Sequence, residues 1–552
     1  MSAEGAADDR AKRIAEISAY HRATRHHFQS YARGPGGLDW ENQPDPFRRY
    51  RGAPLLALDH APLEEGPRYT DVFGGGSVPS ARVDRLSISR LFEDALALSA
   101  WKEVGETRWS LRVDPSSGNL HPTEGYLLSG PVEGLSAVPL LAHYAPREHA
   151  LEVRAEIPLA AWSALTGDLP SDTFFVGVAS IHWRESWKYG ERAFRYCQHD
   201  AGHVLACFAV AAAGLGWKVA LCDDLGDDDL RALLGLRDAF AAEAEEPECL
   251  LAVITRSDAA ADLPLPASAP AGFERIDLRG DPNVLSSDHV DWSAVEFAAE
   301  SSRKPRTEGV YRSERKVAEV PPALLGGADL GLRRIVHGRR SAVSFDGVTS
   351  IARDDFYRVL ASTCRGPARS LPWAPRVHFG LFVHRVTGLE PGLYALARDP
   401  ETVPMLRSAM QKPFLWQKPE GVPAGLELFR LAAGDARSTA RAVSCHQEIA
   451  SDGAFSLAML TEFDPALALH GAWFYRRLFW ECGAVGQVLY LEAEAIGVRA
   501  TGIGCYFDEP THEVFGISTG RFRSLYHFTV GGPVDDPRLR TWPAYPPRDT
   551  GS

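Results

Sequence analysis

The sequence predicts an α+β protein in which one chain contains two similar halves. The block at 189–236 recurs at 470–517 without a gap. Each copy of the block contains a long apolar helix that ends at a glycine. Strand-like apolar runs accompany each copy, at 123–130 and 173–180 in the first half and at 377–386 and 524–532 in the second. With 552 residues the chain also exceeds one compact core, since a domain usually holds about 150 residues.

The repeat keeps a constant offset of 281 residues. Matching glycines and arginines are harder to obtain by chance than matching alanines. The pairs in register include Gly190 with Gly471, Arg195 with Arg476, Gly202 with Gly483, Gly216 with Gly497, Asp227 with Asp508 and Gly235 with Gly516. We infer a duplication, as expected for an internal repeat of this length.

The two apolar helices predict how the halves meet. Gly216 and Gly497 suit the left-handed cap that ends many helices. Apolar residues run nearly all round both helices, so both are expected to be buried, packed on each other. The fold would then be a pseudo-two-fold dimer fused into one chain, and we expect it to work as a monomer.

Composition divides the chain into four parts. Residues 1–79 form an N-terminal extension that begins with the pattern of an amphipathic helix. The first domain is predicted at 80–257 and the second at 330–545. Between them, 258–329 is rich in proline, alanine and serine, which favours a linker.

Bulk properties exclude several classes of protein. The net charge of −13 argues against nucleic-acid binding, which needs clustered basic residues. The longest apolar stretch, at 204–217, is shorter than the roughly 20 residues that span a bilayer, and the N-terminus has no apolar core of a signal peptide. The eight cysteines contain no C-x-x-C pair, which favours buried reduced thiols. We expect a cytoplasmic protein without a membrane partner.

One polar motif opens the second half, "HGRRSAVSFDG" at 337–347. It follows a predicted helix. Arg339, Arg340 and Ser341 could offer several charge-assisted hydrogen bonds to one phosphate. The alternative is a solvated basic helix end, which the helix dipole would stabilise.

A second motif lies in the first half, "DPSSGNLHPTE" at 114–124. The residues of interest are Pro115, Ser116, Ser117 and Asn119. Their hydroxyl and amide groups could bond the edge of a flat heterocycle. The alternative is a turn in which serine and asparagine satisfy their own backbone.

Together these motifs resemble the nitroreductase-like flavin enzymes. "GVRATGIGCYFDE" at 497–509 is similar to the loop beneath the flavin ring in that family. "RESWKYGERAFRYCQHDAGH" at 184–203 and "FWECGAVGQVLYLEAEAIG" at 479–497 are similar to its SagB-type dehydrogenase branch. The resemblance covers both copies, about 420 residues.

The resemblance implies two nitroreductase-like domains, each a mixed or antiparallel sheet flanked by helices. Enzymes of this family bind FMN between two subunits. One half would contribute the phosphate grip and the glycine loop, namely Arg339, Arg340, Ser341, Gly502, Ile503 and Gly504. The other half would contribute Pro115, Ser116, Ser117 and Asn119 to the ring. Basic residues near the C-terminus also contact phosphate in the family, and the candidates are Arg538 and Arg540, or Arg521 and Arg523.

The reciprocal site lacks these motifs. "CRGPARSLPWAPRVHFG" at 364–380 contains no Ser-Ser-Gly-Asn, and "GWKVALCDD" at 216–224 contains no Gly-Ile-Gly. We therefore expect one composite FMN site per chain.

Lys188 and Tyr189 form a pair that the SagB-type branch is thought to use to remove a proton from substrate. A lysine could act as a base if burial lowered its pKa. The alternative is a surface lysine beside a packed tyrosine. The second copy has Leu469 and His470 here, so only the first copy keeps the pair.

His199 and His203 are the strongest metal candidates, four residues apart on one helix face. No third ligand is evident on that face, so we expect no metal and interpret both as core histidines at the interface between the halves.

Three functions follow from the resemblance. The first is an FMN-dependent dehydrogenase that takes hydride from a small-molecule or modified-peptide substrate, with O₂ reoxidising the flavin. The second is an NAD(P)H-dependent nitro or quinone reductase. The third is a non-catalytic flavin-binding or scaffold protein.

Overall fold

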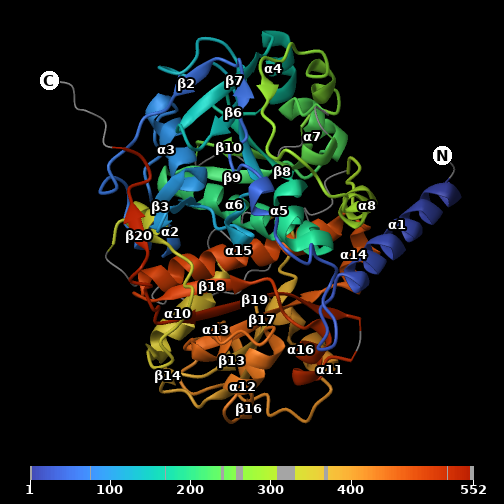
Figure 1. The fold of residues 1–552 in the computed structure, drawn as a ribbon, viewed down its shortest axis with the longest axis vertical. Helices are drawn as coiled ribbons and strands as arrows, with labels where there is room; N and C mark the ends of the chain where they lie inside the picture. Colours follow the sequence, from blue (N-terminus) through green and yellow to red (C-terminus); the bar gives the residue numbers. More distant parts are fainter. Residues whose placement is uncertain are drawn as a thin grey trace.

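The computed structural model describes residues 3–74, 76–167, 169–237, 241–256, 265–307, 330–365, 371–518 and 520–546. These residues form two stacked α+β domains that meet through a central layer of helices (Figure 1). The predicted α+β class is confirmed. Among the described residues, no helix combines the length and the apolar character that crossing a bilayer requires.

The first domain is built on an antiparallel sheet in the order β2-β7-β6-β5-β8-β10-β9. Its strands are β2 (Leu55–Ala57), β5 (Thr123–Ser129), β6 (Leu140–Ala145), β7 (Ala150–Glu156), β8 (Phe174–Ile181), β9 (Lys218–Leu221) and β10 (Glu245–Ile254). The inner face packs on α3 (Arg85–Leu96) and α6 (Ala193–Gly214). The outer face packs on α4 (Leu159–Thr166) and α7 (Asp227–Leu234).

The second domain repeats this plan in the order β16-β15-β13-β17-β19-β18. Its strands are β13 (Val377–Val383), β15 (Gly392–Ala397), β16 (Glu427–Ala433), β17 (Phe455–Glu462), β18 (Arg499–Ile503) and β19 (Phe522–Gly531). The inner face packs on α10 (Arg353–Thr363) and α15 (Phe474–Ala495). The outer helices are α11 (Val403–Ala409), α12 (Arg437–Val443), α13 (Ile449–Asp452) and α16 (Asp508–Val514).

The four strands expected from sequence are confirmed as β5, β8, β13 and β19. Both faces of each sheet are covered, so a central strand such as β8 is buried along its whole length. For this reason it appears in the sequence as a continuous apolar run and not as an alternating one.

The remaining elements connect the two domains or extend from them. They are α1 (Ala3–Ala23), α2 (Tyr69–Phe73), α5 (His182–Tyr189), α8 (Ser293–Ser301), α9 (Leu332–Gly338), α14 (Asp464–His470), β1 (Tyr50–Arg51), β3 (Leu98–Val104), β4 (Thr107–Arg112), β11 (Asp281–Pro282), β12 (Ile351–Ala352), β14 (Val386–Thr387) and β20 (Arg540–Trp542). The helix predicted at the N-terminus is confirmed as α1. Within the predicted linker 258–329, residues 265–307 are described; they include β11, paired with β1, and α8, packed on α1. The rest of that linker lies outside the described residues.

The duplicated helices end in the same way. Gly216 and Gly497 have φ angles of 71° and 78°. After each helix a backbone amide returns to a carbonyl inside it, Trp217 N to Ala212 O at 2.9 Å and Val498 N to Ala493 O at 3.0 Å. This is the Schellman arrangement, which needs a residue that tolerates positive φ. The predicted glycine caps are therefore confirmed.

The predicted contact between α6 and α15 is also confirmed (Figure 1). The helices cross at Gly202 and Gly483, the same position in the two copies. A Cβ on Gly202 would fall within 3.0 Å of the Trp480 backbone, and one on Gly483 within 3.0 Å of the His199 and Gly202 backbones. Real Cβ atoms essentially never come so close, so only glycine permits this spacing.

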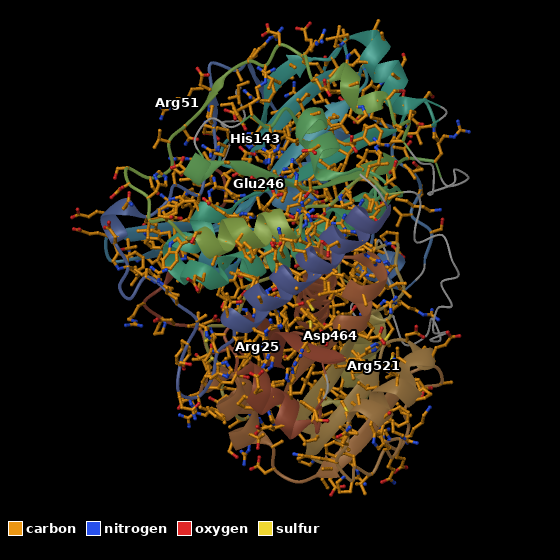
Figure 2. The ribbon with its side chains drawn as sticks, turned by 90° about the vertical axis from the view of Figure 1, so that its right-hand side faces the viewer. Arg25, Arg51, His143, Glu246, Asp464 and Arg521 are labelled. Carbon is orange, nitrogen blue, oxygen red and sulfur yellow. The ribbon has the colours of Figure 1, made fainter. Side chains whose placement is uncertain are left out.

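Both ends of the chain cross to the other half. Helix α1 runs over the junction between the domains, and Arg25, just beyond it, forms an ion pair with Glu509 of the second domain (Figure 2). Near the C-terminus, β20 adds to the β3–β4 hairpin of the first domain, with Arg540 opposite Glu103. Together these crossings hold the two halves in one fixed arrangement.

Helix α9 brings the start of the second half against the first domain. Arg333 is buried and donates hydrogen bonds to both Asp94 and Glu93 of α3. His337 lies 2.8 Å from the same Asp94. The residues directly after α9 are therefore held beside β3 and β4.

Gly202→Val should destabilise the whole molecule, because the added side chain would push α15 away from α6. We expect a loss of about 3 kcal/mol or more in the free energy of unfolding, measured by urea denaturation. Gly34→Ala is the control, because a Cβ at this exposed glycine meets nothing within 4 Å. Equal stability of the two variants would contradict the close crossing.

Candidate active site

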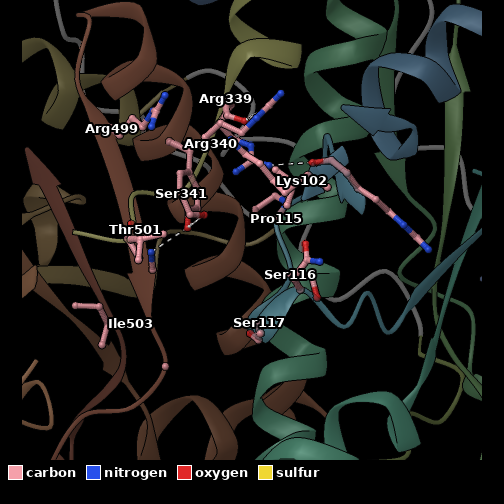
Figure 3. Close-up of a pocket in the computed structure, with 18 of the residues that line it drawn as sticks. Lys102, Pro115, Ser116, Ser117, Arg339, Arg340, Ser341, Arg499, Thr501 and Ile503 are labelled. Carbon is pink, nitrogen blue, oxygen red and sulfur yellow. Dashed lines mark hydrogen bonds between the residues drawn. The ribbon is translucent and has the colours of Figure 1, made fainter. Parts of the chain in front are cut away.

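A cavity of about 780 Å³ opens between the two domains, at the place where the two sequence motifs meet (Figure 3). The first domain contributes the loop after β4 and part of α6. The second contributes the residues after α9, strand β18 and the segment leading into β20. Asn119 and Arg340 both line this one cavity, although 221 residues separate them in the chain.

Eleven of the predicted site residues line this cavity: Pro115, Ser116, Ser117, Asn119, Tyr189, Arg339, Arg340, Ser341, Gly502, Ile503 and Gly504. Lys188 lies directly beside it. A Cβ built on Gly118, a lining residue, would be 3.0 Å from Lys188 Nζ and 2.5 Å from the Tyr189 hydroxyl. The structure thus brings Lys188 and Tyr189 to the loop that carries the serines.

Arg538 is not brought into this wall. Its guanidinium bonds Asp536 at 2.7 Å, and its side chain is 79% exposed. The ion pair with Asp536 thus holds the Arg538 side chain in the solvent. Asp535 and Asp536 themselves line the cavity. Arg540, Arg521 and Arg523 do not line the cavity either.

The serine loop is anchored to α6 by Asp200. The Ser117 amide donates to the Asp200 carboxyl at 3.1 Å, and the Ser117 hydroxyl does so at 3.1 Å. Asn119, at a φ of 60°, donates its amide to Ser110 O at 2.8 Å. Part of the hydrogen-bonding capacity of the polar loop is therefore used by neighbouring backbone groups, as the turn interpretation expected. The loop nevertheless lines the cavity.

Two buried carboxyl groups lie behind this loop. Burial raises the pKa of the Asp200 carboxyl to about 8, although hydrogen bonds from Ser116 and Ser117 oppose the shift. Burial, with the nearby Asp200 next, also raises the pKa of Glu185 well above its ordinary value. Both Glu185 oxygens are buried without a hydrogen-bond partner among the described residues. The raised pKa of Asp200, which lines the cavity, thus favours its protonated form at neutral pH.

The opposite end of the cavity is strongly basic. Arg339 is buried, donates to Val113 O and Arg112 O, and lies over the Tyr490 ring. Burial, and then the charge of Arg339, lower the pKa of Arg340 to about 10. Lys102 and Arg499 complete the cluster of cations, and Arg499 bonds Asp535 at 2.7 Å. Four cations gathered at one end of the cavity form a site for an anion.

Gly502 in β18 and Gly504 directly after it form a glycine floor, where there is no room for a side chain. A Cβ on Gly502 would collide with the Tyr526 hydroxyl, and one on Gly504 would collide with the Tyr196 ring. The Gly502 amide donates to the Tyr490 hydroxyl at 3.0 Å, which also lies 2.9 Å from the Ser341 hydroxyl. Glycine at 502 and 504 therefore keeps a flat backbone surface between aromatic rings and the open cavity.

Several cavity residues were missed from sequence: Lys102, Arg499, Asp200, His203 and Tyr526. Lys102 lies on β3, in a hairpin that the sequence analysis did not predict. Its signal was present, since Gly105, with φ of 56°, separates two strand-like runs. Arg499 falls inside the glycine motif itself and could have been chosen on its charge.

The reciprocal position is filled by an ion pair. By the repeat offset, Asp223 stands where Gly504 stands, and Arg477 where Tyr196 stands. Arg477 bonds Asp223 at 2.9 Å and lies 3.8 Å from the centre of the Trp480 ring. Glu481, the counterpart of Asp200, holds the Arg376 and Val377 amides as Asp200 holds Ser117. The backbone plan is kept, but protein side chains occupy the space.

The two metal candidates are hydrogen-bonded interface residues. His199 bonds Leu525 O at 3.0 Å, and His203 lies 3.4 Å from both the Gln487 side chain and the Tyr526 hydroxyl. This agrees with the core interpretation. Elsewhere, the ligand atoms of His60, Glu93 and His149 lie within 4.8 Å of one another. Both ring nitrogens of His149 already have oxygen partners there, at 2.8 and 3.0 Å.

Comparison with solved structures defines the fold. A crystal structure from Anabaena variabilis, of a protein named as a nitroreductase, superposes with a TM-score of 0.67 at 21% identity. The match covers 94% of this chain and 99% of that one. The chain has the nitroreductase fold. Because the match covers nearly all of both chains, the predicted tandem of two nitroreductase-fold domains is confirmed as well.

Two further matches are partial. The Escherichia coli microcin synthetase McbBCD complex with a truncated pro-MccB17 bound matches 45% of this chain and 94% of its own, at 18% identity and a TM-score of 0.28. A protein named as a nitroreductase, in complex with FMN, from Exiguobacterium sibiricum matches 37% and 88%, at 15% identity and a TM-score of 0.22. At these TM-scores neither supports a conclusion about this chain. No protein-family model and no curated protein matches the sequence.

The raised pKa of Asp200 predicts a pH-dependent stability. The folded state holds this proton more tightly than the unfolded chain, whose carboxyl titrates near 3.8. The stabilisation is therefore complete below about pH 4 and is lost as the pH rises toward about 8, at up to about 1.4 kcal/mol per pH unit. The free energy of unfolding, measured with urea, should fall less from pH 5 to pH 8 in Asp200→Asn than in the wild type. Asp281→Asn, at an exposed site, should behave like the wild type, and a wild-type slope in Asp200→Asn would contradict the prediction.

Proposed function

We propose that this chain is an FMN-dependent oxidoreductase with one composite flavin site, formed by both halves of the molecule. The observation that carries the proposal is the polarity of the cavity of about 780 Å³ between the domains. One end holds four cations, the middle is a glycine floor, and the other end is a polar loop above buried acids. The cations would bind the phosphate of FMN, the glycine floor would lie against its isoalloxazine ring, and the polar loop would contact the edge of the ring.

The basic end suits the phosphate of FMN. Arg339 and Arg340 follow α9, Arg499 begins β18, and Lys102 comes from β3 of the first domain. Asp535 and Glu494 stand near as counter-charges. Burial, and then the charge of Arg339, lower the pKa of Arg340, and a phosphate dianion would offset both effects.

The floor and loop suit a flat ring. At Gly502 and Gly504 the Tyr526 hydroxyl and the Tyr196 ring lie against the backbone, and both glycines line the cavity, where a ring could approach the backbone closely. Ser116, Ser117 and Asn119 would present hydroxyl and amide groups to its polar edge. When bound there, the flavin would supply hydride transfer at its N5 atom.

Lys188 and Tyr189 would handle the proton that accompanies hydride transfer. They stand beside Gly118 at the polar end of the cavity, where the substrate would have to meet the ring. The carboxyl groups of Asp200 and Glu185 are nearby, and burial raises the pKa of both. With a pKa of about 8, Asp200 could hold a proton near neutral pH. A proton-removing lysine favours the dehydrogenase interpretation, with a small-molecule or modified-peptide substrate and O₂ as the final acceptor.

The filled reciprocal position supports a single flavin per chain. The Arg477–Asp223 ion pair stands at the positions that correspond to Tyr196 and Gly504, which line the open cavity on the other side. A tightly packed pair of charges could leave only at a high cost in unpaired buried charge.

The test is to release the cofactor from the purified chain and identify it by mass spectrometry with its stoichiometry. One FMN per chain is expected. The yellow protein is then mixed without oxygen with a thiazoline-containing peptide or with NADPH. Bleaching by the thiazoline supports the dehydrogenase, and bleaching by NADPH the reductase. A colourless protein that does not bind added FMN would contradict the proposal and favour the non-catalytic alternative.

Arg340→Ala should weaken FMN binding by about 10²-fold, because it removes a charge-assisted donor from the phosphate end. The measurement is fluorescence titration of the apoprotein with FMN. Arg538→Ala is the matched control, since that arginine is exposed and bound to Asp536, and its affinity should not change. Equal affinities of the two variants would remove Arg340 from the site.

Lys188→Ala should keep the flavin but slow its anaerobic reduction by substrate about 10²-fold, as expected for the loss of a positioned base. The rate is followed as bleaching by the probe that reduces the wild type. The exposed Lys218 on β9 provides the control variant Lys218→Ala. A wild-type rate in Lys188→Ala would show that the lysine has no role in proton transfer.

A further inference from the structure

Two cysteines from distant parts of the second domain are brought together at the end of the glycine floor. Cys505 directly follows Gly504 and lines the cavity, and Cys445 follows α12. The two segments run side by side: the Phe507 amide donates to Val443 O at 2.8 Å, and the Gln447 side chain donates to Cys505 O at 3.0 Å. Within this arrangement the two thiols lie close enough for each to change the pKa of the other, and both act on the pKa of Tyr31.

The surroundings give the two sulfurs different properties. The hydrogen bond from Cys445 lowers the pKa of the Cys505 thiol, and the nearby Arg192 acts in the same direction. Arg192 is buried and donates to Gly504 O at 2.8 Å, next to Cys505. The pKa of Cys445 is raised by the same hydrogen bond and by burial. Cys505 is therefore suited to be a thiolate nucleophile and Cys445 to be the thiol that follows it.

The backbone around Cys445 is held in an unfavourable conformation. Cys445 and His446 both have positive φ, at 53° and 59°. Neither is a glycine, so this conformation costs free energy and persists only because neighbouring bonds hold it. The Gln447 side chain, which donates to both Ser444 O and Cys505 O, supplies such bonds. The strained loop that carries Cys445 is thus bonded directly to the Cys505 backbone.

The other cysteines differ from this pair. Cys197, Cys207, Cys249, Cys364 and Cys482 are buried. Cys222 is partly exposed, as Cys445 and Cys505 are, but burial raises its pKa, and neighbouring acids contribute. A partly exposed thiol with a lowered pKa and a second thiol in contact is the arrangement expected of a reactive pair.

We propose that Cys445 and Cys505 are a redox-active dithiol that a peroxide converts into a reversible disulfide in the cavity wall. The inference does not depend on a bound flavin. It extends the proposed function because a flavin oxidase that uses O₂ releases hydrogen peroxide in its own cavity.

The chemistry balances with hydrogen peroxide as the oxidant. The Cys505 thiolate attacks one peroxide oxygen, an S–O bond forms, the O–O bond breaks, and hydroxide leaves. The Cys445 sulfur then attacks the Cys505 sulfenic acid, an S–S bond forms, the S–O bond breaks, and water leaves with the proton of Cys445. In sum, two thiols and one H₂O₂ give one disulfide and two waters, and a dithiol reductant restores the pair.

The wild-type chain provides the direct test. The purified protein is treated with a small molar excess of H₂O₂, its thiols are counted, and a non-reducing digest is analysed by mass spectrometry. The eight thiols should fall to six, with one cross-linked peptide joining Cys445 to Cys505, and dithiothreitol should restore eight. Retention of all eight thiols, or oxidation of either cysteine without the cross-link, would overturn the proposal.

Variants separate the two roles. In Cys445→Ser, dimedone should trap a sulfenic acid on Cys505, since no second thiol can displace it. In Cys505→Ser, oxidation of Cys445 should slow by at least about tenfold, because the thiolate is lost. Cys222→Ser is the control and should form the Cys445–Cys505 disulfide like the wild type. Dimedone labelling of Cys445 in place of Cys505 would reverse the assigned roles and overturn the proposal.

Discussion

The contact between α6 and α15 at Gly202 and Gly483 is the constraint on which the rest of the structure depends. Two backbones meet where neither has a side chain, so the separation of the helices is set by the main chain alone. Helix α6 carries Asp200 and Tyr196, and α15 carries Tyr490. The distance between the polar loop and the glycine floor follows from this crossing. Close-packed interiors transmit such a constraint without much relaxation.

Fusion of the two copies into one chain allowed their sites to differ. In a true homodimer both sites carry the same residues, whereas here Gly504 and Tyr196 face an open cavity while Asp223 and Arg477 close its counterpart. The hydrogen bonds that Asp200 and Glu481 accept from the backbone amides of the two loops are nevertheless alike. Side chains, and not a change of fold, decide which cavity is open.

Much of this architecture could be predicted from the sequence because it rests on local chemistry. The glycine caps at Gly216 and Gly497 follow from backbone sterics, and the register of the repeat identified equivalent positions before any contact was known. Arg339, Arg340 and Ser341 were found because three donors stand together in the chain.

What escaped prediction depends on distant contacts or on competition within the chain. Lys102 joins the basic cluster only because the β3–β4 hairpin packs beside the residues that follow α9. Asp200 stands between the two histidines that were considered as metal ligands, and its partner is the Ser117 loop far earlier in the chain. Arg538 had the right charge, but Asp536, two residues away, holds it in the solvent. The periodicity of the sequence cannot predict these side-chain partners, because they depend on which groups meet after folding.

The pairing of β20 with β3 has a consequence for how the protein is made. Lys102 and Thr541, which bond each other across this sheet, are 439 residues apart. Contacts of such separation are slow to form, because a very long loop must close before they contribute. The cavity between the domains therefore cannot be completed by the first half of the chain alone. The second wall of the cavity can form only after the second half has been translated and has packed against the first half.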